Sequence, residues 1–179
     1  MAYILNLAGG SDVGGYENVG MNASDGKSRI AQSFSFSSPP TIDGAEVFLR
    51  SEGPGAGGDL LVQIETNAGP PNKPSDTLAN ASLVGTISSF SGTTYAWYSV
   101  SFSPITLLAN TKYWLVTKLA TEAGTAPIYR ETITADAYSG GASAYFQGSA
   151  VWEDEVLSVD MSVRLSGYFA GGAALATEI

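Results

Sequence analysis

Residues 95–118, YAWYSVSFSPITLLANTKYWLVTK, predict two long β-strands joined by a tight corner. In the first half, every second residue points to the same face of a sheet, which places Tyr98, Val100 and Phe102 together. Residues 112–119 continue the alternation in the second half. The period of two places one apolar set on one face of a sheet, and the rest of the chain can be read outward from these two strands.

The corner between the two strands has its own signature. Leu107, Thr111 and Tyr113 have the spacing Leu-x-x-x-Thr-x-Tyr, which resembles the tyrosine corner of β-sandwich domains. A buried tyrosine hydroxyl needs a hydrogen-bond partner. We therefore expect the Tyr113 hydroxyl to bond to backbone upstream and so to determine both the turn and the register.

Further strands are predicted on both sides of this stretch, and no window predicts a helix. The last strand, residues 157–168, is the most amphipathic, with Val159, Met161 and Val163 on one face. A Gly-rich turn between residues 45–50 and 60–66 suggests a hairpin. The remaining predicted strands are residues 29–36, 83–88, 127–132 and 142–147. Many short strands separated by turns indicate an all-β, antiparallel β-sandwich that is jelly-roll-like.

Composition divides the chain into three parts. Residues 1–28 are rich in glycine and small polar residues and suggest an extended N-terminal arm, with one possible strand at residues 3–7. Residues 29–168 form the predicted sandwich domain, and residues 169–179 form a C-terminal tail. On this interpretation, deletion of residues 1–28 should leave a folded sandwich and weaken only assembly.

Charge and composition exclude several functions. The net charge is −9, and the eight basic residues are scattered, so neither nucleic acid nor an anionic membrane is an expected partner. The chain has no Cys and no His, which excludes the usual zinc, copper, haem and iron–sulfur sites and His-dependent catalytic triads. No apolar run is long enough to span a membrane, and no secretory signal is evident.

Acidic residues are the only candidate metal ligands. Calcium takes carboxylate and carbonyl oxygens, but no EF-hand spacing is present, and solvated acidic turns explain the same residues. The candidates are Asp12, Glu17, Asp25, Asp43, Glu153, Asp154 and Glu155. Nothing in the sequence places two carboxylates opposite each other as glycoside hydrolysis requires, so we expect no enzyme and no cofactor.

Six aromatic residues outside the predicted core are candidate contacts: Tyr95, Trp97, Tyr129, Tyr138, Tyr145 and Trp152. They could stack on the rings of a glycan, form a subunit interface, or pack within the domain. The sequence leaves the three alternatives open.

The order of the predicted strands resembles a diverse group of β-sandwich modules of bacterial surface proteins and phage virion proteins. The matching segments are AQSFSF, AEVFLR, LLVQIET, TLANASLVGTI, YAWYSVSFS, ITLLANTKYWLV, ASAYFQGSAVW and LSVDMSVRLSGYF. The resemblance implies a non-enzymatic virion protein made in the host cytoplasm, above all a capsid decoration (cement) protein bound to the major capsid or another virion protein. It carries over no catalytic residue. The alternative that it implies is a carbohydrate-binding module.

Apolar content predicts self-association. Only 14% of residues are charged and 19 are aromatic, so some large apolar side chains must lie outside the core, and we place Tyr95, Trp97 and Trp152 there. We therefore expect a homo-oligomer. A trimer follows from the resemblance alone, because decoration proteins often occupy threefold positions of a shell.

Overall fold

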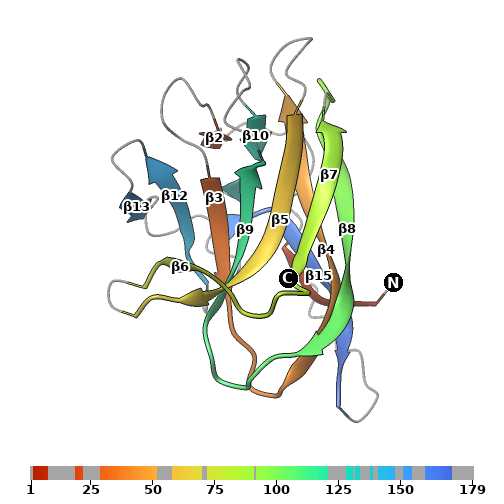
Figure 1. Ribbon diagram of the computed structural model, residues 1–179, viewed down its shortest axis with the longest axis vertical. Helices are drawn as coiled ribbons and strands as arrows, with labels where there is room; N and C mark the ends of the chain where they lie inside the picture. Colours follow the sequence, from red (N-terminus) through yellow and green to blue (C-terminus); the bar gives the residue numbers. More distant parts are fainter. Residues whose placement is uncertain are drawn as a thin grey trace.

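The computed structural model describes residues 2–7, 19–21, 29–51, 58–69, 72–90, 92–120, 128–130, 132–133, 138, 141–147, 151–154 and 160–170. All regular structure in these residues is β-strand, and all strands except one short separate pair form two antiparallel sheets packed face to face (Figure 1). The prediction of an all-β sandwich is therefore confirmed.

The first sheet, called here the β4 sheet, is built around β4 (Pro40–Ser51). One edge of β4 pairs with β8 (Ala96–Thr106). Along its other edge, the N-terminal part of β4 pairs with β15 (Val163–Phe169) and its C-terminal end pairs with β10 (Ile128–Arg130). Outside these lie β1 (Tyr3–Leu7) beside β15 and β2 (Val19–Met21) beside β10.

The second sheet, called the β9 sheet, has β9 (Tyr113–Leu119) next to β5 (Gly58–Asn67) at its centre. On the far side of β9 follow β3 (Arg29–Phe34), β12 (Ser143–Gln147) and β13 (Val151–Asp154). On the far side of β5 lie β7 (Val84–Phe90) and β6 (Pro74–Leu78). A separate pair is formed by β11 (Thr132–Ile133) and β14 (Asp160–Met161).

Eight of these strands make a jelly roll. The order β1-β15-β4-β8 in one sheet faces the order β3-β9-β5-β7 in the other, so the chain passes repeatedly between the sheets. The hairpin predicted from residues 45–50 and 60–66 is wrong, because β4 and β5 lie in different sheets. Both strands bury an apolar face, and placing them in opposite sheets lets these faces meet.

The core fills the space between the sheets. Of the residues predicted there, Val100, Phe102, Leu115, Met161 and Val163 are buried, and Tyr98 packs against the core from its margin. Val159 lies outside the described residues. Alternation along the strands therefore identified the buried face of β8, β9 and β15 correctly.

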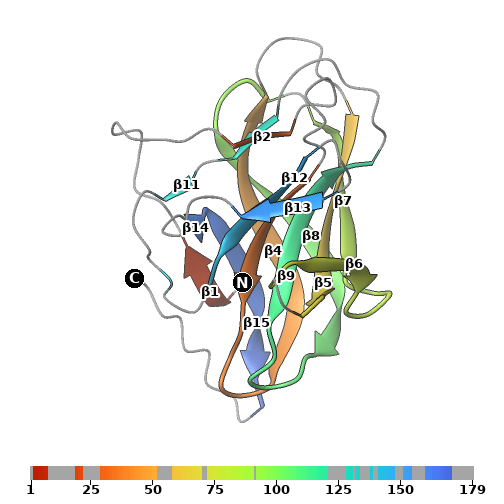
Figure 2. The same ribbon diagram turned by 90° about the vertical axis from the view of Figure 1, so that its left-hand side faces the viewer.

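Strand β1 is part of the sandwich, although the sequence assigns it to an arm. It lies beside β15 at the edge of the β4 sheet (Figure 2). Its apolar side chains are buried in the main core: Ile4, Leu5 and Leu7. The sandwich therefore begins within residues 1–28, and removal of this segment is not expected to leave it folded.

Most residues of the predicted N-terminal arm and C-terminal tail lie outside the described residues. Apart from β1 and β2, the structure describes only Ala2 of the predicted arm. Of the predicted tail it describes Phe169, whose ring meets the Phe36 ring edge-on at 5.5 Å, and Ala170. The arm and the tail as functional units stay predictions.

The corner after β8 carries the chain from the β4 sheet to the β9 sheet. The Tyr113 hydroxyl accepts a hydrogen bond of 3.2 Å from the backbone N–H of Leu108. The Thr111 hydroxyl donates to the carbonyl oxygen of Ala109 at 3.1 Å. Leu107 is buried in the core. The upstream backbone contact expected from the spacing of these residues is therefore present.

Replacement Tyr113→Phe is expected to lower the free energy of unfolding by about 0.5–1.5 kcal/mol, the usual value of one hydrogen bond. The expected loss is smaller than the roughly 1–3 kcal/mol of a stranded buried group, because Leu108 is 70% exposed and water can reach its N–H. Urea denaturation measures the change. An unaltered midpoint would mean that the hydroxyl does not stabilise the corner.

Candidate functional site

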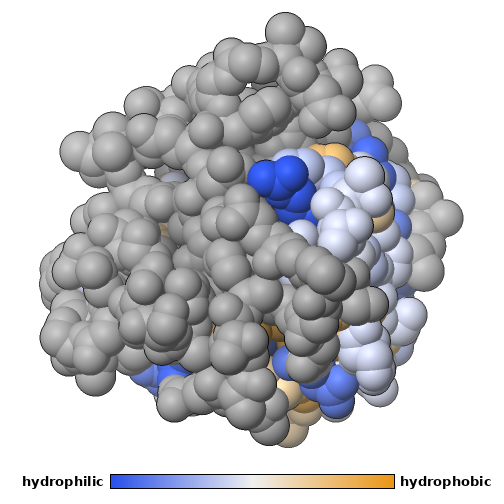
Figure 3. Space-filling model, turned by 90° about the horizontal axis from the view of Figure 1, so that it is seen from above, coloured by the Kyte–Doolittle hydropathy of each residue, from blue (hydrophilic) through white to orange (hydrophobic). Residues whose placement is uncertain are grey.

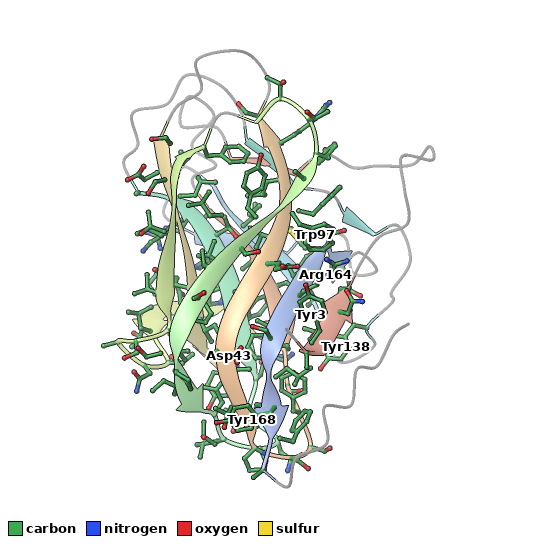
Figure 4. All side chains as sticks on the ribbon, turned by 90° about the vertical axis from the view of Figure 1, so that its right-hand side faces the viewer. Tyr3, Asp43, Trp97, Tyr138, Arg164 and Tyr168 are labelled. Atoms are coloured by element: carbon green, nitrogen blue, oxygen red, sulfur yellow. The ribbon has the colours of Figure 1, made fainter. Side chains whose placement is uncertain are left out.

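The outer face of the β4 sheet carries a continuous row of arginine and aromatic side chains. Neighbouring members touch in this order: Arg50, Tyr95, Phe48, Trp97, Arg164 and Tyr3. They come from β4, β15, β1, β8 and the residue before β8. Figure 4 shows Trp97, Arg164 and Tyr3 following one another across this face. We call this set the arginine–aromatic row.

Strand alternation explains the row. On β4, the buried residues Val47 and Leu49 alternate with Phe48 and Arg50, which are half-buried and point outward. Pairing then brings β8 alongside, with Trp97 opposite Phe48. The row thus arises from outward positions of strands whose inward positions form the core.

The contacts in the row are close. The Tyr95 and Phe48 rings are nearly parallel, with 6° between their planes and 5.3 Å between their centroids. The Arg164 guanidinium carbon lies 3.8 Å from the Trp97 ring centroid, and the Arg50 guanidinium carbon lies 4.9 Å from that of Tyr95. Cation–π contacts of this kind stabilise by roughly 0.5–2 kcal/mol each. The Trp97 and Tyr95 rings therefore already make stacking contacts within the chain.

The Glu46 carboxylate, called here the Glu46 hub, connects the side chains at the end of the row formed by Arg164 and Tyr3. It accepts hydrogen bonds from the Tyr3 hydroxyl at 2.8 Å, the Ser99 hydroxyl at 2.9 Å and Arg164 at 3.1 Å. Arg164 also donates from Nε to the amide oxygen of Asn6 at 2.8 Å. One carboxylate therefore links β1, β15, β4 and β8 and positions Arg164 over Trp97.

These contacts shift two pKa values. Burial by itself would raise the pKa of Glu46, but the hydrogen bonds from Tyr3, Arg164 and Ser99 outweigh burial and lower it below the usual 4.5. The hydrogen bond to Glu46, with burial, raises the pKa of Tyr3. At neutral pH Glu46 is therefore ionised and Tyr3 is protonated, which is the state that supports the row.

A second carboxyl group, Glu65, is buried on the outer face of the β9 sheet. It accepts hydrogen bonds from the Gln63 amide at 2.6 Å and from the backbone N–H of Asp76 at 2.9 Å. The Asp76 carboxylate pairs with Arg29. Burial raises the pKa of Glu65, and the nearby Asp76 charge adds to this. Both carboxyl groups are thus engaged by their own chain and do not form the pair that glycoside hydrolysis would need.

The variant Glu46→Gln is expected to destabilise the protein more at neutral pH than in acid. A carboxyl whose folded pKa lies below 4.5 contributes stability above that value, and the contribution is lost as the pH falls through the folded pKa. The difference in unfolding free energy between wild type and variant should therefore shrink below pH 4.5. Urea denaturation over a pH series measures it.

The matched control is Glu65→Gln, for which the slope has the opposite sign. Because the folded pKa of Glu65 lies above 4.5, the wild type gains stability relative to this variant as the pH falls through that pKa. Parallel pH curves for the two variants would contradict at least one of the two assignments.

Tyr138, a predicted contact residue, belongs to a buried polar network instead. Its hydroxyl donates to the carbonyl oxygen of Ser35 at 2.6 Å, and its backbone N–H donates to the carboxyl of Asp160 at 2.7 Å. The Gln32 side chain donates to Asp160 at 2.7 Å and accepts from the backbone N–H of Met161 at 2.7 Å. The network fastens Tyr138 and β14 to β3, and it explains Tyr138 by packing within the domain.

Trp152 is only 8% exposed, so the prediction that it lies outside the core as an exposed contact is wrong. It packs in a small second cluster on the outer face of the β9 sheet, with Ala31, Trp114, Val116 and Ala144. Strand β13 pairs with β12 at the edge and brings Trp152 to this cluster. Alternation alone could not show that an outer face is covered in this way.

The structure places the backbones of two further candidates. Tyr129 on β10 stands opposite Arg50 of β4, and Tyr145 on β12 stands opposite Ile30 of β3. Of the predicted aromatic contacts, only Tyr95 and Trp97 are brought together on one surface by described side-chain contacts.

The described residues contain no group of three acidic, histidine or cysteine side chains that could hold a metal. Among the calcium candidates, the Asp43 carboxylate accepts a hydrogen bond from the Ser166 hydroxyl at 2.6 Å. The other candidates have side chains outside the described part. Nor does that part contain a helix long and apolar enough to cross a membrane.

Comparison of the chain with protein-family models, with curated proteins and with solved structures finds no match. The site must therefore be interpreted from its own chemistry.

Sequence reasoning missed five residues of this face: Tyr3, Glu46, Phe48, Arg50 and Arg164. Alternation could have indicated that three of them point outward. Phe48 and Arg50 alternate with the apolar residues of their strand, and Arg164 lies between Val163 and Leu165. What the sequence could not show is that these strands lie side by side.

Proposed function

We propose that this protein is a non-enzymatic structural protein of a phage virion, most specifically a capsid decoration protein, and that it docks through the arginine–aromatic row. The observation that carries the docking surface is the row itself, which gathers Trp, Tyr and Arg on one sheet face. These three residue types dominate the energetic centres of protein interfaces.

Charge favours an acidic partner surface. The row and its Glu46 hub contain two arginines and one carboxylate, whereas the whole chain has 17 acidic and 8 basic residues. The row and Glu46 together therefore carry one net positive charge on a molecule that is acidic as a whole. A protein surface with exposed carboxylates would complement it, since complementary charge sets the orientation of docking.

The virion assignment is supported by the fold class and by the resemblance of the predicted strand order to β-sandwich modules of phage virion proteins. Jelly rolls are used both by viral capsid proteins and by lectins, so the fold admits both the shell and the glycan as partners. The internal stacking of Trp97 under Arg164 and of Tyr95 along Phe48 favours a protein partner over a sugar. A homo-oligomer, with a trimer as the first expectation, stays part of the proposal.

The proposal is tested by purifying virions from the phage that encodes the chain and identifying their proteins by mass spectrometry. Shells that lack the protein are then incubated with purified variants and sedimented. Trp97→Ala should weaken binding roughly 30-fold, about 2 kcal/mol, as expected for a central interface aromatic. The control is Tyr168→Ala, since Tyr168 lies at the far end of the same sheet (Figure 4) and is 49% exposed.

Absence from virions would remove the virion assignment. Equal binding by both variants would move the contact away from the row. Specific binding on a glycan array, lost in Trp97→Ala, would favour the carbohydrate-binding alternative. Light scattering tests the oligomer separately, and a monomer both in solution and on the shell would contradict it.

A further inference from the structure

In the part of the chain that the structure describes, strand β1 is paired along one side only. Among the described residues its only strand partner is β15, with Leu7 opposite Val163 and Asn6 opposite Arg164. It is a sheet edge, YILNL, that contains no charged residue and no proline, the usual protections against pairing with another chain. Figure 2 shows it at the margin of the sheet, beside β15.

The core nevertheless depends on β1. Its three apolar side chains are almost completely buried, and its outward residues Tyr3 and Asn6 bond to Glu46 and Arg164. The position beside β15 must therefore be filled by a strand with this sequence, but the strand need not come from the same chain. The β1 of a second copy offers every one of these contacts unchanged.

The segment between β1 and β2 is long enough for β1 to reach a second copy. Residues 8–18 separate β1 from β2 and comprise eleven residues, four of them glycine. The twelve steps from Leu7 to Val19 can span up to roughly 40 Å when extended. That is enough to reach a neighbouring molecule, and exchange of an identical element is a low-cost route to an oligomer.

We propose that β1 is exchanged between copies of this chain, so that the β1 of one copy pairs with the β15 of another. The partner is thus a second copy, and the contact surface is the edge of β15 that pairs with β1, together with Glu46 and Arg164. This proposal concerns self-association and holds whether or not the protein belongs to a virion.

The test uses the absence of native cysteine. In the full chain, Leu7→Cys and Val163→Cys are introduced together at directly opposed positions. Opposed residues of antiparallel strands have Cα atoms about 4.5–5.5 Å apart, within the range of a disulfide. The protein is oxidised at increasing concentration and separated without reductant. Exchange predicts covalent oligomers whose share rises roughly in proportion to protein concentration.

The matched control is Val62→Cys with Thr117→Cys, an opposed and buried pair on the central strands β5 and β9. It should give only disulfides within one chain. If the β1 pair behaves like this control up to the concentration at which the protein associates, the proposal is wrong.

A measurement on the wild type covers the case in which the cysteine variants fold poorly. Equal amounts of isotope-labelled and unlabelled protein are unfolded together and refolded. Isotope-filtered nuclear Overhauser effects then report contacts between copies. Contacts from Leu7 of one copy to Val163 of another support exchange, and their absence in an associated sample overturns it.

Discussion

Removal of residues 1–7 is expected to unfold the protein. The deletion takes three buried apolar side chains of β1 out of the core, and each such loss typically costs about 2–5 kcal/mol. It also deprives Glu46 and Arg164 of their bonds to Tyr3 and Asn6. The sum is comparable to the roughly 5–15 kcal/mol that stabilises an entire domain. Circular dichroism and urea denaturation of the truncated chain measure the effect.

A pair of point variants separates the role of β1 from a general effect of shortening the chain. Leu7→Ala should cost about 2–5 kcal/mol, because Leu7 is 2% exposed. Leu108→Ala should cost less than about 0.5 kcal/mol, because Leu108 is 70% exposed. A truncated chain that retains a cooperative transition would restore the view that residues 1–28 are an arm needed only for assembly.

Replacement Asp160→Ala is expected to have the second largest effect. It removes the acceptor of two hydrogen bonds of 2.7 Å, from the Gln32 amide and the backbone N–H of Tyr138. Asp160 is 2% exposed, so water cannot readily replace it. The variant loses two hydrogen bonds at roughly 1–3 kcal/mol each, about 2–6 kcal/mol in total. We expect a value in the lower half of this range, because the Gln32 amide keeps a bond of 3.3 Å to the carbonyl oxygen of Ser33.

The control for Asp160 is Asp59→Ala. The Asp59 carboxylate also accepts a backbone hydrogen bond, from Ser89 at 2.9 Å, but at an exposed position. Its loss should cost less than about 1 kcal/mol, since the freed N–H can bond to water. Equal midpoints for the two variants in urea would show that the buried network does not hold β14 to β3.

Local patterns predicted the parts of the fold that depend on local chemistry. The alternation around Val100 and Phe102 located β8, and the spacing before Tyr113 located the corner. The same rule failed for Asp160, which alternation places on the solvent side of a single strand over residues 157–168. In the structure Asp160 is buried because Gln32, 128 positions away, faces it, and no local pattern contains that pairing.

Two other differences between prediction and structure also arise from pairings between distant parts of the sequence. The sequence of residues 67–82 contains three prolines and by itself predicts a long loop. In the structure Pro74–Leu78 is β6, because β5 offers it a pairing edge at Glu65 and Asn67. The arginine–aromatic row was visible only as Tyr95 and Trp97. Its other members join through pairings of β4 with β8 and β15, which are set by the packing of the whole chain.

The pairing of β1 with β15 also bears on how the chain folds as it is synthesised. Leu7 and Val163 are 156 positions apart, so β1 leaves the ribosome well before its partner strand. At about 5–20 residues per second, β1 waits roughly 8–30 seconds for β15. Throughout that interval its apolar side chains face solvent, chaperones or other nascent chains. Neighbouring ribosomes on one messenger would then bring several unpaired β1 strands together before any copy closes.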